Sequence, residues 1–271
     1  MLRISPPETG VNLHNQVDTI RISHLLPKHD EISLLSSSFY LVGIVTSTVL
    51  IFSNSVRLCM ALTTFPWWLP FVVFAGMATA DFASGMTHWA ADTWGSIRMP
   101  ILGRRFLHPF RVHHVNPHDF LRRSFLATNG DIAIAGVPLL SAALAIPTAS
   151  PWQLCFGVFL TAFCTAGLPT NQFHQWAHIP KPPMIVRMLQ NTGIILSHQA
   201  HAKHHTHPHM DTYCIALGWC NPLLLKLDFW HHMERFVTRL TGVRPRADED
   251  NFKAEAEKVL FAALPRGEFD V

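Results

Sequence analysis

Four long apolar stretches limit what this chain can fold into more strongly than any other feature of its sequence. They cover residues 32–53, 66–88, 132–150 and 152–171. A helix of about 20 apolar residues crosses the hydrocarbon core of a bilayer. Only 14% of the 271 residues are charged, whereas a soluble domain usually carries about 25%. The sequence therefore predicts an all-α fold, an integral membrane four-helix transmembrane bundle, in which Pro138 and Pro147 make the third stretch the weakest.

The apolar stretches also divide the chain. A polar tail, residues 1–31, precedes a membrane-embedded domain, residues 32–241, and residues 242–271 are expected to form a peripheral amphipathic helix. Six arginines lie between the second and third stretches, but only Arg57 lies between the first and second. Because short cytoplasmic loops are rich in Lys and Arg, both termini and the histidine-rich cap are predicted to be cytoplasmic. The net charge of +3 gives no support for nucleic acid as a partner.

Histidine is the outlier of the composition. The chain has 18 histidines, and 13 of them fall between His88 and His209. They form four clusters, in residues 81–95, 108–120, 171–178 and 198–214. Imidazole is the commonest metal ligand among side chains, and so many in membrane-proximal segments on one predicted side indicate a shared metal site.

The first two clusters have spacings that suit such a site. Asp81, His88 and Asp92 are seven and four residues apart, which places them on one face of a continuous helix. A carboxylate within a membrane span is costly, so Asp81 is a candidate functional residue. His113 and His114 are neighbours and point about 100° apart on a helix, so they can serve two metals, or one metal and one supporting contact.

The last two clusters add further spacings typical of ligands. His174 and His178 are four residues apart and share a helical face, which suits two ligands on one metal. His201, His204 and His205 form an HxxHH pattern. Three more histidines flank that pattern: His198, His207 and His209.

The number and type of these side chains bear on the metal. Eight or nine candidate ligands suit two ions held mostly by imidazole, whereas a structural zinc takes four ligands and usually includes cysteine. Imidazole accepts iron, zinc, copper and nickel, but attack on the C–H bonds of a lipid chain needs a redox metal such as iron. The sequence has no nucleotide fingerprint, haem motif or ferredoxin-type cysteine run, so electrons are expected from a separate protein.

Several motifs in a fixed order resemble those of one family. They read SGMTHWAADTWGS, PFRVHHVNP, FLATNGD, TNQFHQWAH, HAKHHTHPH and YCIALGWCN, between about residues 80 and 250. In these stretches the chain resembles the plasmanylethanolamine desaturases, the CarF and Kua lipid desaturases. The resemblance implies a di-iron enzyme that consumes O2 and desaturates the 1-O-alkyl chain of a phospholipid between its first two carbons, giving the vinyl ether of a plasmalogen. It also implies a separate electron donor, cytochrome b5-like or ferredoxin-like.

Carried over position by position, the resemblance implies a set of metal ligands: His88, His113, His114, His174, His178, His201, His204, His205 and His209. It gives Asp92, Asn129 and Asp131 structural roles around those ligands. Imidazole ligands need hydrogen-bond acceptors that fix their orientation, and we expect Asp81, Asp92 and Asp131 to be these acceptors.

The chain departs from the family pattern at one place. Arg122 and Arg123 stand where a family histidine is expected, just before the TNGD motif. Four other histidines look like local additions: His108, His118, His198 and His207.

Other functions stay open. A plant plastid branch of the family desaturates acyl chains of phosphatidylglycerol and shares QFHxWAH and HAxHH, so an acyl-lipid desaturase is the first alternative. A membrane zinc hydrolase would be expected to carry HExxH, which the sequence lacks. A metal carrier would place ligands along the interior of the spans, and an inactive membrane scaffold would tolerate broken motifs, whereas the core motifs here are intact.

Overall fold

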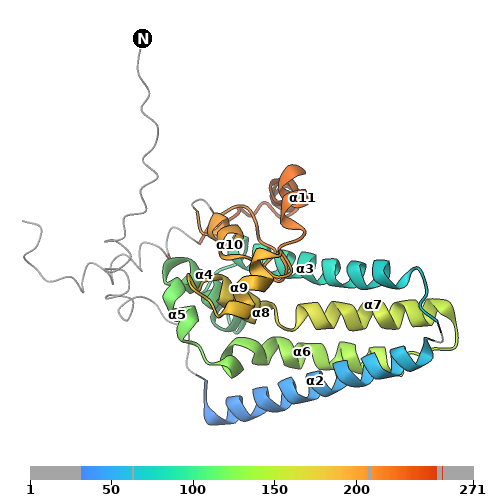
Figure 1. The fold of residues 1–271 in the computed structure, drawn as a ribbon. Helices are drawn as coiled ribbons and strands as arrows, with labels where there is room; N and C mark the ends of the chain where they lie inside the picture. The colour runs from blue at the N-terminus through green and yellow to red at the C-terminus, as the bar shows by residue number, and fades with distance from the viewer. Residues whose placement is uncertain (1–31, 63, 207–208, 249–251, 253–271) are drawn as a thin grey trace, which may run out of the picture.

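The chain is helical, with four long helices side by side and shorter helices gathered at one end of them (Figure 1). The structure is a computed structural model that describes residues 32–62, 64–206, 209–248 and 252. No strand occurs within these residues. The predicted tail of residues 1–31 and most of the predicted C-terminal helix lie outside them.

Four segments are long and apolar enough to cross a membrane. They are α2 (Leu34–Ala61), α3 (Leu69–Thr93), α6 (Phe125–Ala145) and α7 (Pro151–Gly167), which continues into α8 (Thr170–Ala177). Large apolar side chains such as Leu34, Phe52 and Phe71 are exposed on these helices, as expected where lipid rather than water is the solvent. The predicted membrane bundle of four helices is confirmed.

The third span differs most from its prediction. It begins at Phe125 rather than at residue 132, because the Ser124 hydroxyl caps the helix by accepting a hydrogen bond from the Ala127 N–H (3.3 Å). The polar TNGD motif therefore lies inside the helix. Pro138 also lies within it, and packing against neighbouring helices makes a proline tolerable there.

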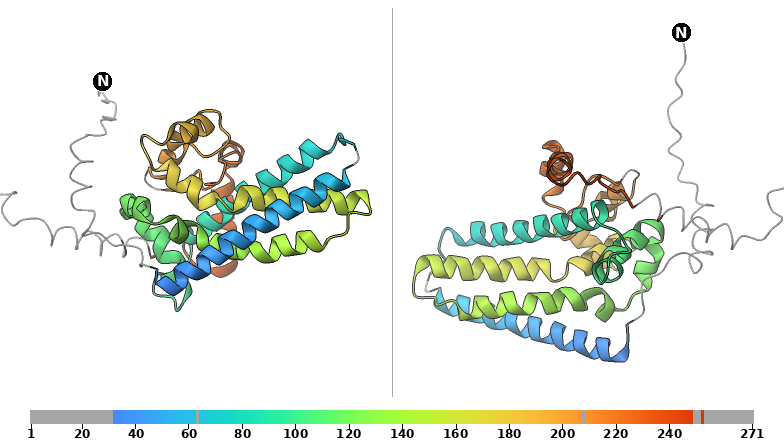
Figure 2. Two further views of the ribbon diagram at one scale, coloured as in Figure 1. Left: turned by 60° about the horizontal axis from the view of Figure 1, so that its bottom comes forward. Right: turned by 180° about the vertical axis from the view of Figure 1, so that it is seen from behind.

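The spans pack in pairs, α2 along α6 and α3 along α7, and α6 and α7 join the pairs (Figure 2). Asn54 in α2 donates a hydrogen bond to the Leu140 carbonyl in α6 (3.0 Å). The Arg57 guanidinium donates to the carbonyls of Ala143 and Ile146 at the end of α6 (2.8 and 2.6 Å). Since the bilayer interior offers such groups no water, these bonds fasten α2 to α6.

The shorter helices form a cap at one end of the bundle (Figures 1 and 2). They are η1 (Gly103–Leu107), α4 (His108–Val115), α5 (Pro117–Arg122), α9 (Met184–Asn191), α10 (His198–His204), α11 (Asn221–Lys226) and α12 (Phe229–Thr241). The histidine clusters lie in this cap or at the ends of α3 and α8 that reach it.

Asp81 holds the loop before α11 against α3. Its Oδ1 accepts hydrogen bonds from the N–H groups of Leu217 and Gly218 (2.8 Å each), and its Oδ2 accepts one from Cys220 (2.9 Å). Gly218 has a φ of 76°, a conformation that favours glycine. Three backbone N–H groups thus supply the hydrogen bonds that the buried Asp81 carboxylate needs.

Candidate metal centre

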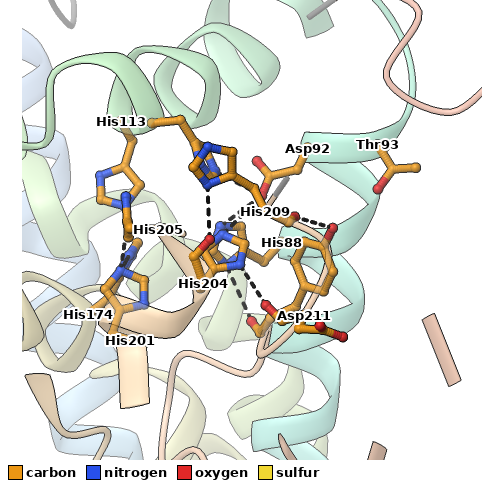
Figure 3. A network of polar contacts seen from close by, with 12 residues as sticks. His88, Asp92, Thr93, His113, His174, His201, His204, His205, His209 and Asp211 are labelled. Atoms are coloured by element: carbon orange, nitrogen blue, oxygen red, sulfur yellow. Dashed lines mark hydrogen bonds and ion pairs between the residues drawn. The ribbon is translucent and has the colours of Figure 1, made fainter. Parts of the chain in front are cut away.

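The ends of α3, α4, α8 and α10 bring imidazoles from all four sequence clusters together (Figure 3). Two groups of side chains result, and within each group the possible ligand atoms lie within 4.8 Å of one another. The five-histidine group consists of His113, His174, His178, His201 and His205. The aspartate group consists of His88, Asp92, His114 and His204.

In the five-histidine group, the Nε2 atoms converge. The Nε2 of His201 lies 2.7 Å from that of His178 and 2.9 Å from that of His174. The Nε2 of His205 lies 3.0 Å from those of His113 and His201. A neutral imidazole has one proton for two nitrogens, so these contacts cannot all be hydrogen bonds. Metal–nitrogen bonds of about 2.1 Å at right angles would place neighbouring nitrogens about 3.0 Å apart, so the spacing fits ligands of one ion.

In the aspartate group, one carboxylate oxygen faces three imidazoles. The Asp92 Oδ2 lies 3.0 Å from His114 Nε2, 3.1 Å from His88 Nε2 and 3.3 Å from His204 Nε2. His88 and His204 have no exposed surface, and Asp92 is 4% exposed. A buried carboxylate needs a compensating positive charge or hydrogen-bond donors.

The hydrogen bonds of the other ring nitrogens show that two of these imidazoles are not donors to Asp92. His88 Nδ1 lies 3.2 Å from the Tyr213 carbonyl, and His204 Nδ1 lies 2.8 Å from the Asp211 carbonyl. A carbonyl only accepts, so both rings carry their proton on Nδ1. Each Nε2 then directs a lone pair at the carboxylate, and two acceptors this close require a cation between them. The aspartate group therefore fits a metal ion.

A protonated histidine does not supply that positive charge. Burial lowers the pKa of His204 and of His178 to about 3. Burial, followed by the neighbouring imidazoles, holds the pKa of His113 and His201 well below the ordinary histidine value. These rings are therefore neutral at physiological pH, which is the form that binds metal.

Two pairs of neighbouring histidines connect the groups. His113 and His205 belong to the five-histidine group, whereas His114 and His204 belong to the aspartate group. The ring centres are 5.8 Å apart in the first pair and 5.6 Å apart in the second. Each HH pair thus contributes one ring to each group, which corresponds to the two-metal alternative considered for His113 and His114.

The two acidic residues of α3 lie in different surroundings. Asp92 was expected to support the ligands, but its carboxylate lies among them and is itself a candidate ligand. Asp81 was expected to orient an imidazole, but it binds the backbone amides of residues 217–220. The acceptors for His88 and His204 are backbone carbonyls instead.

Asn129 and Asp131 are the predicted polar residues of α6. Asp131 is exposed, and its carboxylate interacts with the Tyr40 hydroxyl and with Arg123 rather than with an imidazole of either group. Asn129 is buried and donates hydrogen bonds to the Phe125 carbonyl (2.9 Å) and to Gln172 (3.1 Å), so it joins α6 to α8.

Arg123 occupies the position where a family histidine was expected. Its guanidinium donates to the Ala127 carbonyl (2.8 Å) and lies in the field of Asp131 and Asp119. Its backbone carbonyl accepts from Gln175 Nε2 (3.3 Å). Arg123 thus joins the end of α5 to α6 and α8 and is not a member of either group.

His209 is the predicted ligand that neither group contains. Its ring centre lies 4.7 Å from that of His114, and its Nδ1 donates to the His204 carbonyl (3.0 Å). Its φ of 58° is unusual for a residue with a side chain. His209 therefore borders the aspartate group.

The histidines interpreted as local additions lie outside both groups wherever the structure describes them. His198 Nδ1 donates to the Ala177 carbonyl at the end of α8 (2.7 Å), and the His108 ring packs against Phe252. His118 is half-buried in α5. His207 lies outside the described residues.

Sequence reasoning missed the residues that hold the ligand-bearing helices in place. Gln175 donates to the Phe120 carbonyl (2.7 Å) and so joins α8 to α5. Tyr213 and Asp211 act through their backbone carbonyls. The only signal in the sequence was that Gln175 and Tyr213 lie inside the quoted motifs. Any residue can supply a backbone carbonyl, so a hydrogen bond to one cannot be predicted from the residue type.

These features define an integral membrane protein with a histidine-rich site able to bind metal ions at one end of its bundle. A family model described as the lipid desaturase domain matches residues 77–248, a range that contains both groups. The chain belongs to this family of lipid desaturases, which are oxidoreductases, and the family resemblance seen in the motifs is confirmed.

Several named proteins are similar over most of the chain. Plasmanylethanolamine desaturase of Myxococcus xanthus is 40% identical over 206 residues, which cover 76% of this chain and 72% of the relative. Plasmanylethanolamine desaturase 1 of Mus musculus is 42% identical over 187 residues, covering 65% and 68%. Fatty acid desaturase 4, chloroplastic, of Arabidopsis thaliana is 35% identical over 182 residues, covering 64% and 53%. No solved structure matches this chain.

Proposed function

We propose that this protein is an O2-dependent di-iron desaturase that forms the 1-O-alkenyl bond of plasmalogens from an alkyl-ether phospholipid. The observation that carries the proposal is the pair of metal-binding groups, connected by two pairs of neighbouring histidines, within a lipid desaturase domain. The substrate is proposed from two relatives, 40% and 42% identical, that are plasmanylethanolamine desaturases.

The five-histidine group and the aspartate group would each hold one iron ion. Bound iron supplies the redox chemistry that activates O2 toward C–H bonds. Imidazole binds both iron and zinc, so the choice of iron rests on the reaction, since zinc has no redox states.

The proposed reaction removes one hydrogen atom from each of the first two carbons of the 1-O-alkyl chain, counted from the ether oxygen, and a C=C bond forms between these two carbons. O2 takes up these two hydrogens together with two electrons and two protons, and it leaves as two molecules of water. Because the sequence has no flavin, haem or ferredoxin motif, a separate cytochrome b5-like or ferredoxin-like protein would supply the electrons.

The side chains around the two groups keep bulk water away from this chemistry. The Phe110 ring centre lies 5.3 Å from that of His88, and the Phe120 ring centre lies 5.0 Å from that of His174. His88 and His204 are fully buried. An apolar cover of this kind strengthens electrostatic interactions within the site and limits side reactions with water.

The second candidate is an acyl-lipid desaturase acting on phosphatidylglycerol or another phospholipid. It is supported by the 35% identity to a plastid fatty acid desaturase. The ether-lipid substrate is preferred because the plasmanylethanolamine desaturases are 40% and 42% identical and are covered over more of their length.

Expression in a host that lacks plasmalogens and is supplied with alkyl-ether phospholipids tests the proposal. We expect mass spectrometry to detect acid-labile vinyl ethers, and the purified protein to contain one iron ion for each of its two groups. A new double bond in an acyl chain would support the second candidate instead. Bound zinc in place of iron, with no new double bond in any lipid, would contradict both.

A further inference from the structure

A groove follows α7 where α3 and α6 flank it, and it encloses about 200 Å³. Phe163 and Gly167 of α7 contribute to its lining, together with Ala80 and Ala83 of α3 and Ala135 and Leu139 of α6. Ala135 and Leu139 are exposed and belong to a membrane-spanning helix. The groove is therefore accessible from the side that faces lipid hydrocarbon.

Three polar side chains in the lining make hydrogen bonds within the protein. The Ser84 hydroxyl donates to the Asp81 carbonyl (2.6 Å) and the Thr87 hydroxyl donates to the Ala83 carbonyl (2.9 Å). Asn171 Nδ2 donates to the Thr128 carbonyl (2.9 Å). With these donors already satisfied, the groove suits an apolar occupant.

One end of the groove lies next to the metal centre. Thr87 is exposed in the lining and directly precedes His88 of the aspartate group. Phe110, also in the lining, contacts the His88 ring, with ring centres 5.3 Å apart. Thr170 and Asn171 line the same end and begin the helix that carries His174. An occupant of the groove would end beside the aspartate group.

We propose that this groove binds the hydrocarbon chain of a membrane phospholipid, with the carbons nearest the glycerol at the metal centre and the rest of the chain pointing into the bilayer. The proposal rests on the proposed function for the identity of the lipid, whereas the position of the groove is independent of it. The groove runs along the spans, which is also the direction of a lipid chain in the bilayer. The chain therefore needs no turn to reach the metal centre.

The length of the groove limits what it can select. On α3 the lining extends from Ala80 to Thr87, a rise of about 10 Å at 1.5 Å per residue. Only the first part of a long chain fits, and the remainder stays in the bilayer. We therefore expect turnover to depend weakly on total chain length and strongly on bulky substituents near the glycerol.

Gly167 and Ala135 offer a way to fill the groove without disturbing the helices. A Cβ at Gly167 would meet only the Ala80 Cβ, at 3.7 Å, and Ala135 is exposed. The test variants are G167L and A135F. Ala142 is exposed on α6 but does not line the groove, so A142F is the matched control.

Photolabelling in lipid nanodiscs tests the proposal on the full-length, iron-loaded protein. The probe is a 1-O-alkyl-2-acyl ethanolamine phospholipid with a diazirine in the part of its alkyl chain that the groove would hold. We expect adducts concentrated in the peptides that contain residues 80–87, 132–139 and 163–168. We expect G167L and A135F to lower both the labelling of these peptides and turnover by about tenfold. Each larger side chain would displace part of the hydrocarbon chain, and a tenfold change corresponds to the loss of apolar contact equal to about one buried side chain. A142F should match the wild type, with iron content equal in all four proteins.

Two results would overturn the groove assignment: adducts spread evenly over the lipid-facing surface, or labelling of the groove that is unchanged in both G167L and A135F. Groove labelling without any vinyl ether product would contradict the proposed function and leave the groove assignment standing. Vinyl ether formation with labelling outside the groove would contradict the groove assignment and leave the proposed function standing.

Discussion

Among single residues, Asp92 has the most unusual surroundings. It supplies the one carboxylate of the two groups, and its Oδ2 faces three imidazole nitrogens at 3.0–3.3 Å. Two of those nitrogens, on His88 and His204, direct lone pairs at it, because their rings hold the proton on Nδ1. The negative charge of Asp92 is therefore compensated only when a cation is bound. We expect Asp92 to affect metal binding more than folding.

The Asp92→Asn substitution tests this link. The amide keeps the shape of the side chain and removes its charge, so the aspartate group should lose its ion while the five-histidine group keeps its own. We expect the iron content to fall to about half and turnover to fall by about a hundredfold or more, as for changes to metal ligands and their supports. Metal analysis by mass spectrometry gives the first quantity. Asp228→Asn is the control, since Asp228 also contacts histidines, His231 and His232, but lies exposed on α12; both quantities should stay normal.

Alanine substitutions of single histidines test both groups. His174 lies in the five-histidine group, and His114 and His204 lie in the aspartate group. Each change removes a ligand nitrogen, so we expect product to fall by about a hundredfold or more, with normal insertion into the membrane. His198→Ala is the matched control, because His198 lies outside both groups. Near-normal turnover in H114A, H174A and H204A would contradict the ligand assignment.

Residue spacing predicted which histidines would meet, but not how they divide. The HH and HxxHH patterns indicated ligands, and eight of the nine imidazoles lie in the two groups. Which group each ring joins depends on how α4 and α10 are oriented relative to α3 and α8, and no local pattern encodes that. Spacing also left two roles open for Asp92, because a carboxylate one helical turn from a histidine suits a support as well as a ligand.

Among the structural elements, the contact between α3 and the loop of residues 214–220 helps to orient the His88 ring. That loop follows Tyr213, whose carbonyl orients the His88 ring. Asp81 holds the loop through three backbone amides. Asp81 was predicted to orient an imidazole itself, but it holds the segment whose Tyr213 carbonyl orients the His88 ring.

The Asp81→Asn substitution should therefore weaken the fold. An amide has one acceptor oxygen in place of two, and its NH2 group would face a backbone N–H. Leaving such buried groups unpaired costs about 2–4 kcal/mol, so thermal unfolding in detergent should begin at a clearly lower temperature. Asp131→Asn is the matched control within the spans, because the Asp131 carboxylate interacts with the side chains of Tyr40 and Arg123 and does not hold the loop. Equal unfolding temperatures for the two variants would show that Asp81 does not anchor the loop.

The existence of the four spans was predictable, but their ends were not. Hydropathy identified each apolar stretch, since the bilayer sets the length that a helix needs. The start of α6 was missed because the TNGD motif is polar, although Ser124 caps the helix before it. The short helices of the cap have no apolar stretch of their own, and tertiary hydrogen bonds such as those of Gln175 place them.

Across the whole molecule, all the candidate ligands lie at one end of the bundle, so its orientation decides which compartment supplies iron and electrons. Arginines are concentrated in the loop on the side of the metal centre, whereas the link between α2 and α3 has no charged residue after Arg57. By the positive-inside rule, the metal centre should face the cytoplasm. Thr64 lies in the α2–α3 link and Lys181 lies between α8 and α9, and both are exposed.

Cysteine labelling of intact cells tests this orientation. In a C59S background, a membrane-impermeant maleimide should label T64C directly and K181C only after the cells are permeabilised, because the two positions lie at opposite ends of the bundle. The C59S protein alone gives the background from the remaining cysteines, of which Cys164 and Cys214 are buried. The reverse pattern would place the metal centre outside the cytoplasm. A cytoplasmic electron donor could then not reach it, and a donor from the other compartment would be required.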